Sequence, residues 1–153
     1  MKIRCFAPGD EAALLAVFHS AVHETAARDY TPAQLAAWAP ADIDAARWGE
    51  HMRYLRPFVV ERDGYIVGYA DLQPNGYIDH FFVSGPHGRQ GVGALLMRRI
   101  HAEAQRLGLS AMTADVSLTA QPFFARHGFA LQEQREVVRN GITIPNALMR
   151  KAL

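Results

Sequence analysis

Apolar positions recur every three to four residues along the segment from 92 to 107, which follows a glycine-rich stretch. The residues with this spacing are Val92, Leu95, Leu96, Ile100, Ala104 and Leu107. Such spacing is typical of the buried face of an amphipathic helix. The apolar run Tyr77–Val83, ahead of the glycines, predicts a strand. This part of the chain therefore reads as strand, glycine-rich turn and helix.

Breaks in the apolar pattern divide the first third of the chain into four elements. Proline, glycine and capping side chains mark where each helix begins or ends. The predicted elements are a strand over Ile3–Phe6, a helix capped by Asp10 that runs to about Arg28, a helix from Thr31-Pro32 to near Pro40, and a helical segment over Asp42–Tyr54.

Two turn pairs with strong hairpin character, Asp63-Gly64 and Asn140-Gly141, organise most of the remaining strands. The predicted hairpins join Pro57–Glu61 to Tyr65–Leu72 and Phe129–Val138 to Ile142–Leu153, and a strand over Ala111–Val116 and a short helix over Ala120–His127 lie between them. The sequence therefore predicts an α/β protein with a mixed, mainly antiparallel sheet and helices on both faces.

Composition and charge exclude some classes of protein and leave many open. With 153 residues, 50% of them hydrophobic and 20% charged, the chain resembles an ordinary globular protein, and we expect one domain over 1–153. A formal net charge of +1 gives no general attraction to nucleic acid or membranes. The lone Cys5 lies in an apolar run and is expected to be a buried structural thiol. No signal-peptide or transmembrane pattern is evident, so the expected location is cytoplasmic.

The glycine-rich turn is suited to binding an anion. The first N–H groups of a helix lack partners and lie at the positive end of its dipole, and Gly88, Gly91 and Gly93 would let a pyrophosphate approach the backbone. Arg89 adds a positive charge. The turn lacks the third glycine of a dinucleotide fingerprint and the lysine of a phosphate-binding P-loop. A tight connection without a ligand stays open as an alternative.

Two segments resemble the hallmarks of the GNAT superfamily of N-acetyltransferases. The strand, the R/Q-x-x-G-x-G/A turn and the helix are similar to its acetyl-CoA-binding signature, although Gly88 stands where the family has Gln or Arg. Ala120–Phe129 resembles the second hallmark, a short helix ending in F-Y/F-x-x-x-G-F. The resemblance covers roughly Arg4 to Met149. It implies a splayed sheet that holds acetyl-CoA.

The resemblance also implies transfer of acetyl from acetyl-CoA to a primary amine of a small molecule or peptide. A non-catalytic acyl-CoA-binding or sensor module is the alternative, and a dinucleotide oxidoreductase is a more distant one. A homodimer is possible, because dimers occur widely in the family. The expected cofactor-binding residues are Phe82, Val83, Gly88, Arg89, Gln90, Gly91, Val92, Gly93, Ala94, Ser117 and Phe124. Ser117 could equally be a helix cap, and Phe124 occupies the position of a tyrosine that protonates the leaving thiolate in many relatives.

Strand alternation places Asp79 on one face of the strand Tyr77–Val83 and His80 on the other. Many family members have a proton-accepting carboxylate on this strand. We therefore expect Asp79 to be the catalytic base and His80 the second candidate, with a structural ion pair of Asp79 as the alternative. The resemblance also places the first helices over the acceptor, so the residues expected to bind it are His23, Tyr30, Gln34 and Trp38. Tyr30 is a further candidate to protonate the thiolate.

Two histidines have the spacing of metal ligands. His19 and His23 lie one helical turn apart, but no third ligand accompanies them, and no glutamate follows His19 as in H-E-x-x-H. We therefore expect no metal site.

Overall fold

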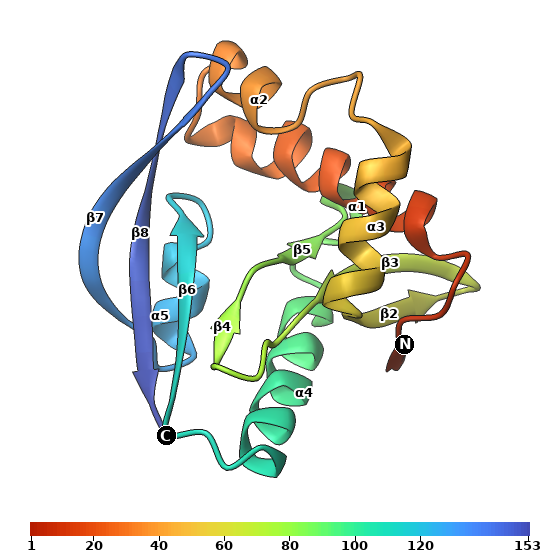
Figure 1. Ribbon diagram of the computed structural model, residues 1–153, viewed down its shortest axis with the longest axis vertical. Coiled ribbons are helices and arrows are strands. Elements are labelled where there is room, and N and C mark those ends of the chain that lie inside the picture. Colours follow the sequence, from red (N-terminus) through yellow and green to blue (C-terminus); the bar gives the residue numbers. More distant parts are fainter.

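Two four-stranded sheets diverge from each other across the molecule (Figure 1). The structure is a computed structural model that describes all 153 residues. The first sheet has the antiparallel order β1 (Lys2–Cys5), β2 (Phe58–Arg62), β3 (Tyr65–Ala70) and β5 (Phe81–Val83). The second has the order β4 (Tyr77–Ile78), β6 (Ala111–Ser117), β8 (Ile142–Ala152) and β7 (Ala130–Arg139), in which only the β4–β6 pair is parallel.

The expectation of one continuous strand over Tyr77–Val83 is wrong. Its first two residues form β4 in the second sheet and its last three form β5 in the first sheet. Asp79 and His80 lie between them and belong to neither strand. The break in this one segment is therefore the point from which the two sheets separate.

The predicted helices are confirmed, with small shifts of their ends. Helix α1 (Glu11–Ser20) continues through a π-helical turn over Ala21–Thr25 and a 3₁₀ turn over Ala26–Arg28. Thr31 and Gln34 form a reciprocal capping box at the start of α2 (Pro32–Trp38). The remaining helices are α3 (Ala45–Leu55), α4 (Val92–Arg106) and α5 (Gln121–Arg126), with a 3₁₀ turn over Gly85–His87.

Helices cover both faces of the first sheet. Val59 and Val60 are adjacent on β2 and both fully buried, one in the hydrophobic cluster beneath α1 and α3 and the other in the cluster beneath α4. Gly68 on β3 lets α4 approach closely, because a Cβ there would lie 2.7 Å from Val92 Cγ1. The start of α4 is thus held close to the sheet edge where the sheets diverge (Figure 1).

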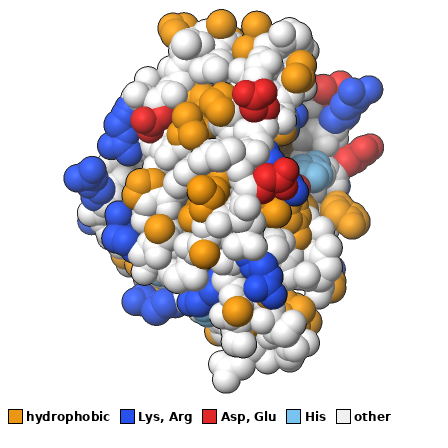
Figure 2. All heavy atoms as spheres, turned by 90° about the vertical axis from the view of Figure 1, so that its left-hand side faces the viewer, with side chains coloured by type: hydrophobic (Ala, Val, Ile, Leu, Met, Phe, Trp, Pro, Cys, Tyr) orange, Lys and Arg blue, Asp and Glu red, His pale blue; other side chains and the backbone are white.

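Both predicted hairpin turns are confirmed by their backbone geometry. Asp63 and Gly64 have φ values of 52° and 81°, and Asn140 and Gly141 have 50° and 73°. Two consecutive positive φ angles are the signature of a type I′ turn. The second turn joins the long hairpin of β7 and β8, where Leu131 and Val138 are exposed. Figure 2 shows this side of the molecule with basic, acidic and apolar side chains intermixed.

Two expectations near the N-terminus are wrong. Cys5 is exposed rather than buried, because it lies on β1 at the edge of the first sheet. Asp10 precedes α1 but makes no capping bond; its carboxylate accepts two hydrogen bonds from Arg4, at 2.8 and 2.9 Å, and one from the Ala7 N–H at 2.8 Å. None of the helices combines the length and apolar character needed to cross a membrane.

The bidentate bond between Arg4 and Asp10 predicts a pH-dependent contribution to stability. The Arg4 guanidinium holds the pKa of Asp10 below its ordinary value. The contribution is therefore complete above an ordinary Asp pKa of about 3.9 and is lost as the pH falls through the lower, folded pKa. Asp10→Asn should reduce the free energy of unfolding by about 1–3 kcal/mol at neutral pH, measured by urea denaturation.

The difference between the wild type and Asp10→Asn should shrink as the pH is lowered below 4 or so, because both side chains are then uncharged. Asp42→Asn, at an exposed position, should change stability by less than about 0.5 kcal/mol. An Asp10→Asn effect that stays constant from neutral to acid pH would contradict this account.

Candidate functional site

A cavity lies where the two sheets diverge. Its wall is mostly apolar and comes from β5, β6, α5 and the end of α2. Five residues singled out from the sequence for different roles meet there: Trp38, Asp79, Phe82, Ser117 and Phe124. An apolar cavity with a few polar groups is the usual form of a small-molecule site.

The edge of β5 that faces the divergence has no partner strand. β5 pairs with β3 on one side only, since it ends the order of the first sheet, and the nearest segment in sequence, β4, has joined the other sheet. Such an edge presents N–H and C=O groups to an extended ligand that carries amides of its own. Phe82 and Val83, predicted to bind the cofactor, form two of its three residues.

The loop ahead of α4 presents a row of free backbone donors. No N–H group from Arg89 to Ala94 donates to another backbone group, and the first helical bond runs from the Leu95 N–H to the Gly91 carbonyl. Gly91 has φ of 88°, which favours glycine. The Gln90 side chain holds the loop by accepting from Arg62 and donating to the Pro86 carbonyl at 3.2 Å. Free donors at the start of a helix are suited to binding an anion.

The start of α4 also packs closely on α5. A Cβ on Gly93 would lie 3.1 Å from two ring atoms of Phe123. Val92 is fully buried, and its side chain packs in the core, so this side chain does not contact a ligand. Phe124 is buried beside the cavity and packs edge-on against Phe81, at 5.4 Å between ring centroids. Of the two aromatic residues of α5, Phe123 thus packs beside the start of α4 and Phe124 lines the cavity.

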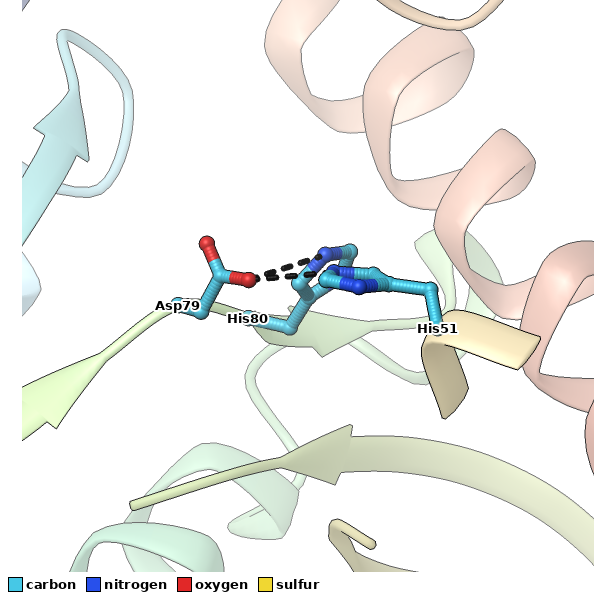
Figure 3. A group of neighbouring side chains, drawn as sticks. All are labelled: His51, Asp79 and His80. Atoms are coloured by element: carbon cyan, nitrogen blue, oxygen red, sulfur yellow. Dashed lines mark hydrogen bonds and ion pairs between the residues drawn. The ribbon is translucent and has the colours of Figure 1, made fainter. Parts of the chain in front are cut away.

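Asp79 and His80 point to the same place, with a third residue that the sequence analysis did not identify (Figure 3). His51, on α3, places its Nε2 atom 3.1 Å from Asp79 Oδ2, and His80 Nε2 lies 3.9 Å from the same oxygen. The expectation that Asp79 and His80 lie on opposite faces is therefore wrong, because both residues lie in the gap between β4 and β5, where strand alternation does not apply. Nothing in the spacing of residue 51 indicated this proximity.

His80 is the most enclosed of the three side chains. Its Nδ1 atom lies 3.0 Å from the hydroxyl of Tyr69, which is fully buried. Burial lowers the pKa of His80 to about 4 despite the opposing effect of the Asp79 charge. His51 is the most accessible, with 44% of its side chain exposed against 30% for Asp79 and 13% for His80. The cluster therefore extends from the protein interior to solvent.

A buried carboxylate holds the break that presents this cluster. Asp71 is 1% exposed, and its Oδ1 atom accepts the N–H groups of both Asp79, at 3.0 Å, and His80, at 2.7 Å. Its own N–H donates to the His80 carbonyl at 3.1 Å. Burial raises the pKa of Asp71 to about 7, although the two accepted bonds oppose this. The sequence signal for Asp71 is a charged residue directly after the apolar strand Tyr65–Ala70.

Three of the four predicted acceptor-binding residues make other contacts. The Tyr30 hydroxyl donates to the Pro145 carbonyl at 2.6 Å and accepts from the Leu118 N–H at 2.9 Å. Gln34 donates to the Thr143 carbonyl, and His23 Nε2 lies 2.7 Å from the Ala39 carbonyl oxygen. These contacts tie the N-terminal helices to β8 and to one another. Of the four residues, Trp38 lines the cavity.

Ser117 is not the helix cap that the sequence left open, because Ala120 is the N-cap residue of α5 and no side chain caps that helix. Ser117 lines the cavity, and its hydroxyl accepts the Ala120 N–H at 3.2 Å, in the turn that leads into α5. The side chain can thus fix the turn while its hydroxyl proton stays available to a ligand.

Comparisons with known proteins agree with this geometry. Residues 26–153 match the family described as "Acetyltransferase (GNAT) domain". The chain is 37% identical, over 151 residues, to the uncharacterized N-acetyltransferase YafP of Escherichia coli (strain K12), covering 98% of this chain and 95% of the relative.

Solved structures share the fold along the whole chain. A GCN5-related N-acetyltransferase from Rhodopseudomonas palustris superposes with a TM-score of 0.94 at 29% identity, covering 99% of this chain and 95% of that one. The paia N-acetyltransferase of Thermoplasma acidophilum, in complex with coenzyme A, has a TM-score of 0.76 at 12% identity, covering 99% and 98%. At that identity, the second likeness concerns the fold alone.

The bonds to Asp71 predict how its variants behave. Asp71→Ala leaves the buried N–H groups of Asp79 and His80 without an acceptor and should lower the free energy of unfolding by about 2–6 kcal/mol, at 1–3 kcal/mol for each orphaned group. Asp71→Asn keeps an oxygen acceptor and should lose less. Chemical denaturation measures both. Equal losses for the two variants would show that the accepted hydrogen bonds do not hold the break.

Proposed function

The chain belongs to the GNAT family of acetyltransferases, and we propose that it transfers an acetyl group from acetyl-CoA to a primary amine of a small molecule or peptide. Family membership makes the chain an acyltransferase and favours an enzyme over a non-catalytic binding module. The observation that carries the proposal is the meeting of three features at the divergence of the sheets: the free edge of β5, the row of free N–H groups before α4, and Asp79.

The donor would lie along these features in order. Its pyrophosphate would accept hydrogen bonds from free amides in the range from Arg89 to Ala94, since the Gly88 N–H already donates to the Gly85 carbonyl. The Arg89 side chain would add a charge-assisted contact. The amides of the pantetheine arm would pair with the free edge at Phe82 and Val83. The thioester would then lie in the apolar cavity, near Phe124 and the Ser117 hydroxyl. The complex of the Thermoplasma relative with coenzyme A supports a coenzyme site in this fold.

The acceptor amine would enter from the side of Trp38 and Asp79. The amine nitrogen attacks the thioester carbonyl carbon, the C–S bond breaks, and the nitrogen loses one proton. Asp79 Oδ2 accepts that proton and releases it to solvent, because 30% of its side chain is exposed. The Nε2–H of His51, 3.1 Å away, donates to the same oxygen and holds it in place. His80 orients this pair from the protein interior. A carboxylate at the cavity wall is within reach of a reacting amine, which is the first requirement of a general base.

The leaving thiolate needs no dedicated acid in this proposal. Phe124 has no proton to donate, and the Tyr30 hydroxyl proton is already donated to the Pro145 carbonyl. An ordinary thiol has a pKa of about 8.5, so the thiolate is a moderately good leaving group near neutral pH and can take its proton from water. In this proposal Tyr30 anchors the helices through its hydroxyl and does not donate a proton to the thiolate.

Replacing Arg89 tests where the pyrophosphate of acetyl-CoA binds. Arg89→Ala should weaken acetyl-CoA binding by about 1–3 kcal/mol, the range of a hydrogen bond to a charged group, and the loss should shrink as salt rises. Titration calorimetry at two salt concentrations measures both effects. Arg47→Ala, which removes an exposed arginine from α3, is the matched control and should leave the affinity unchanged. A loss that is independent of salt would place Arg89 away from the phosphates.

Replacing Asp79 tests its proposed role as the general base. Asp79→Asn should lower kcat by about 10²–10⁴-fold, the usual range for removal of a general base, and leave the affinity for acetyl-CoA nearly unchanged. Asp115→Asn is the matched control, because Asp115 also lines the cavity but is bound to Tyr77 and Arg135. Steady-state kinetics with a panel of amines measures the ratio. If Asp115→Asn lowers kcat strongly and Asp79→Asn leaves it unchanged, Asp79 is not the general base.

A further inference from the structure

Three side chains that can bind metal ions converge at the break between β4 and β5 (Figure 3). One ligand atom from each of His51, Asp79 and His80 lies within 4.8 Å of the other two. We propose that these residues bind a divalent transition-metal ion of the Zn²⁺ class, and that the bound ion takes the carboxylate oxygen that otherwise accepts the proton. The binding half of this inference is independent of the proposed function, whereas the inhibitory half rests on it.

The atoms present match the ligands that Zn²⁺ prefers. Two imidazole nitrogens and a carboxylate oxygen form a common zinc ligand set that leaves a fourth position open. With metal–ligand bonds of about 2.0–2.2 Å, the ligand atoms of a tetrahedral site lie about 3.3–3.6 Å apart. The separations of 3.1 Å and 3.9 Å from Asp79 Oδ2 to the two histidines bracket this range. The two histidine nitrogens lie within 4.8 Å of each other. Closing the site therefore needs a movement of the half-exposed His51 and a shortening of the His80–Asp79 separation by a few tenths of an ångström.

Two of the three ligands are already held in place by a second layer of contacts. The Tyr69 hydroxyl lies 3.0 Å from His80 Nδ1, so the ring presents Nε2 toward Asp79. The Asp79 backbone is held by the Asp71 carboxylate. Hydrogen bonding of the second imidazole nitrogen is the usual way in which proteins orient a metal-binding histidine. The site is therefore largely preformed before an ion arrives.

The other histidine pair of the chain lacks these features. His19 and His23 stack at 4.4 Å between ring centroids, and their Nε2 atoms lie 3.3 and 2.7 Å from the carbonyl oxygens of Pro40 and Ala39. A nitrogen that donates to a carbonyl has no lone pair for a metal. This pair supplies a matched control.

Calorimetric titration of the coenzyme-free protein with ZnCl₂ tests the binding half. We expect one ion per chain, an affinity at least about tenfold lower in His51→Ala and in Asp79→Asn, and an unchanged affinity in His19→Ala. Tyr69→Phe should weaken binding by about 10–100-fold, as loss of a second-layer partner does elsewhere. Visible absorption bands of bound Co²⁺ should appear in the wild type and disappear in His51→Ala. A His51→Ala protein that binds Zn²⁺ as tightly as the wild type overturns the site.

Turnover in the presence of Zn²⁺ tests the inhibitory half. Formation of the acetylated amine is followed rather than release of free thiol, because zinc binds thiolates. Inhibition should be half complete near the dissociation constant from calorimetry and should be reversed by a chelator. Stoichiometric binding with unchanged turnover would overturn this half. Intact zinc binding in a protein that acetylates no amine, with or without chelator, would instead count against the proposed function and leave the metal site standing.

Discussion

The separation of the two sheets depends on one buried carboxylate. A strand that leaves its sheet exposes backbone N–H groups that must find new acceptors, and burying them unpaired is costly. Asp71 Oδ1 accepts both N–H groups at the break between β4 and β5. Because this bond network allows Phe81–Val83 to join one sheet and Tyr77–Ile78 the other, the cavity, the free edge and the cluster around Asp79 all follow from it.

Local patterns predicted nearly all the elements of this fold, because those elements are set by local physics. The apolar period of α4, the capping box at Thr31 and the two type I′ turns each depend on residues a few positions apart. The break at Asp79 does not. A buried acceptor eight residues earlier in the chain overrides the strand propensity of the segment, and no local pattern reveals that contact.

The candidate site likewise combines residues that the local sequence reveals with residues that it does not. The glycine-rich turn could be identified from its own residues, and the order of the two hallmark segments pointed to the cavity. His51 could not, because α3 is placed near Asp79 by packing on α1, which itself packs on β3. The hydrogen bond from the Tyr30 hydroxyl to the Pro145 carbonyl joins residues 115 positions apart, so the sequence did not reveal it either.

The sheet edges differ in how they are protected from other chains. The exposed strand β7 carries Glu133, Arg135, Glu136 and Arg139 and has an irregular register near Leu131, and both features discourage pairing with a neighbouring molecule. β1, the other outer edge, has only four residues. The edge of β5 has no such protection, but the second sheet stands across from it. On β7, charged side chains discourage pairing with another strand. At β5, the nearby second sheet limits the space instead: it would exclude a strand that belongs to another sheet but leave room for a single thin chain with amide groups.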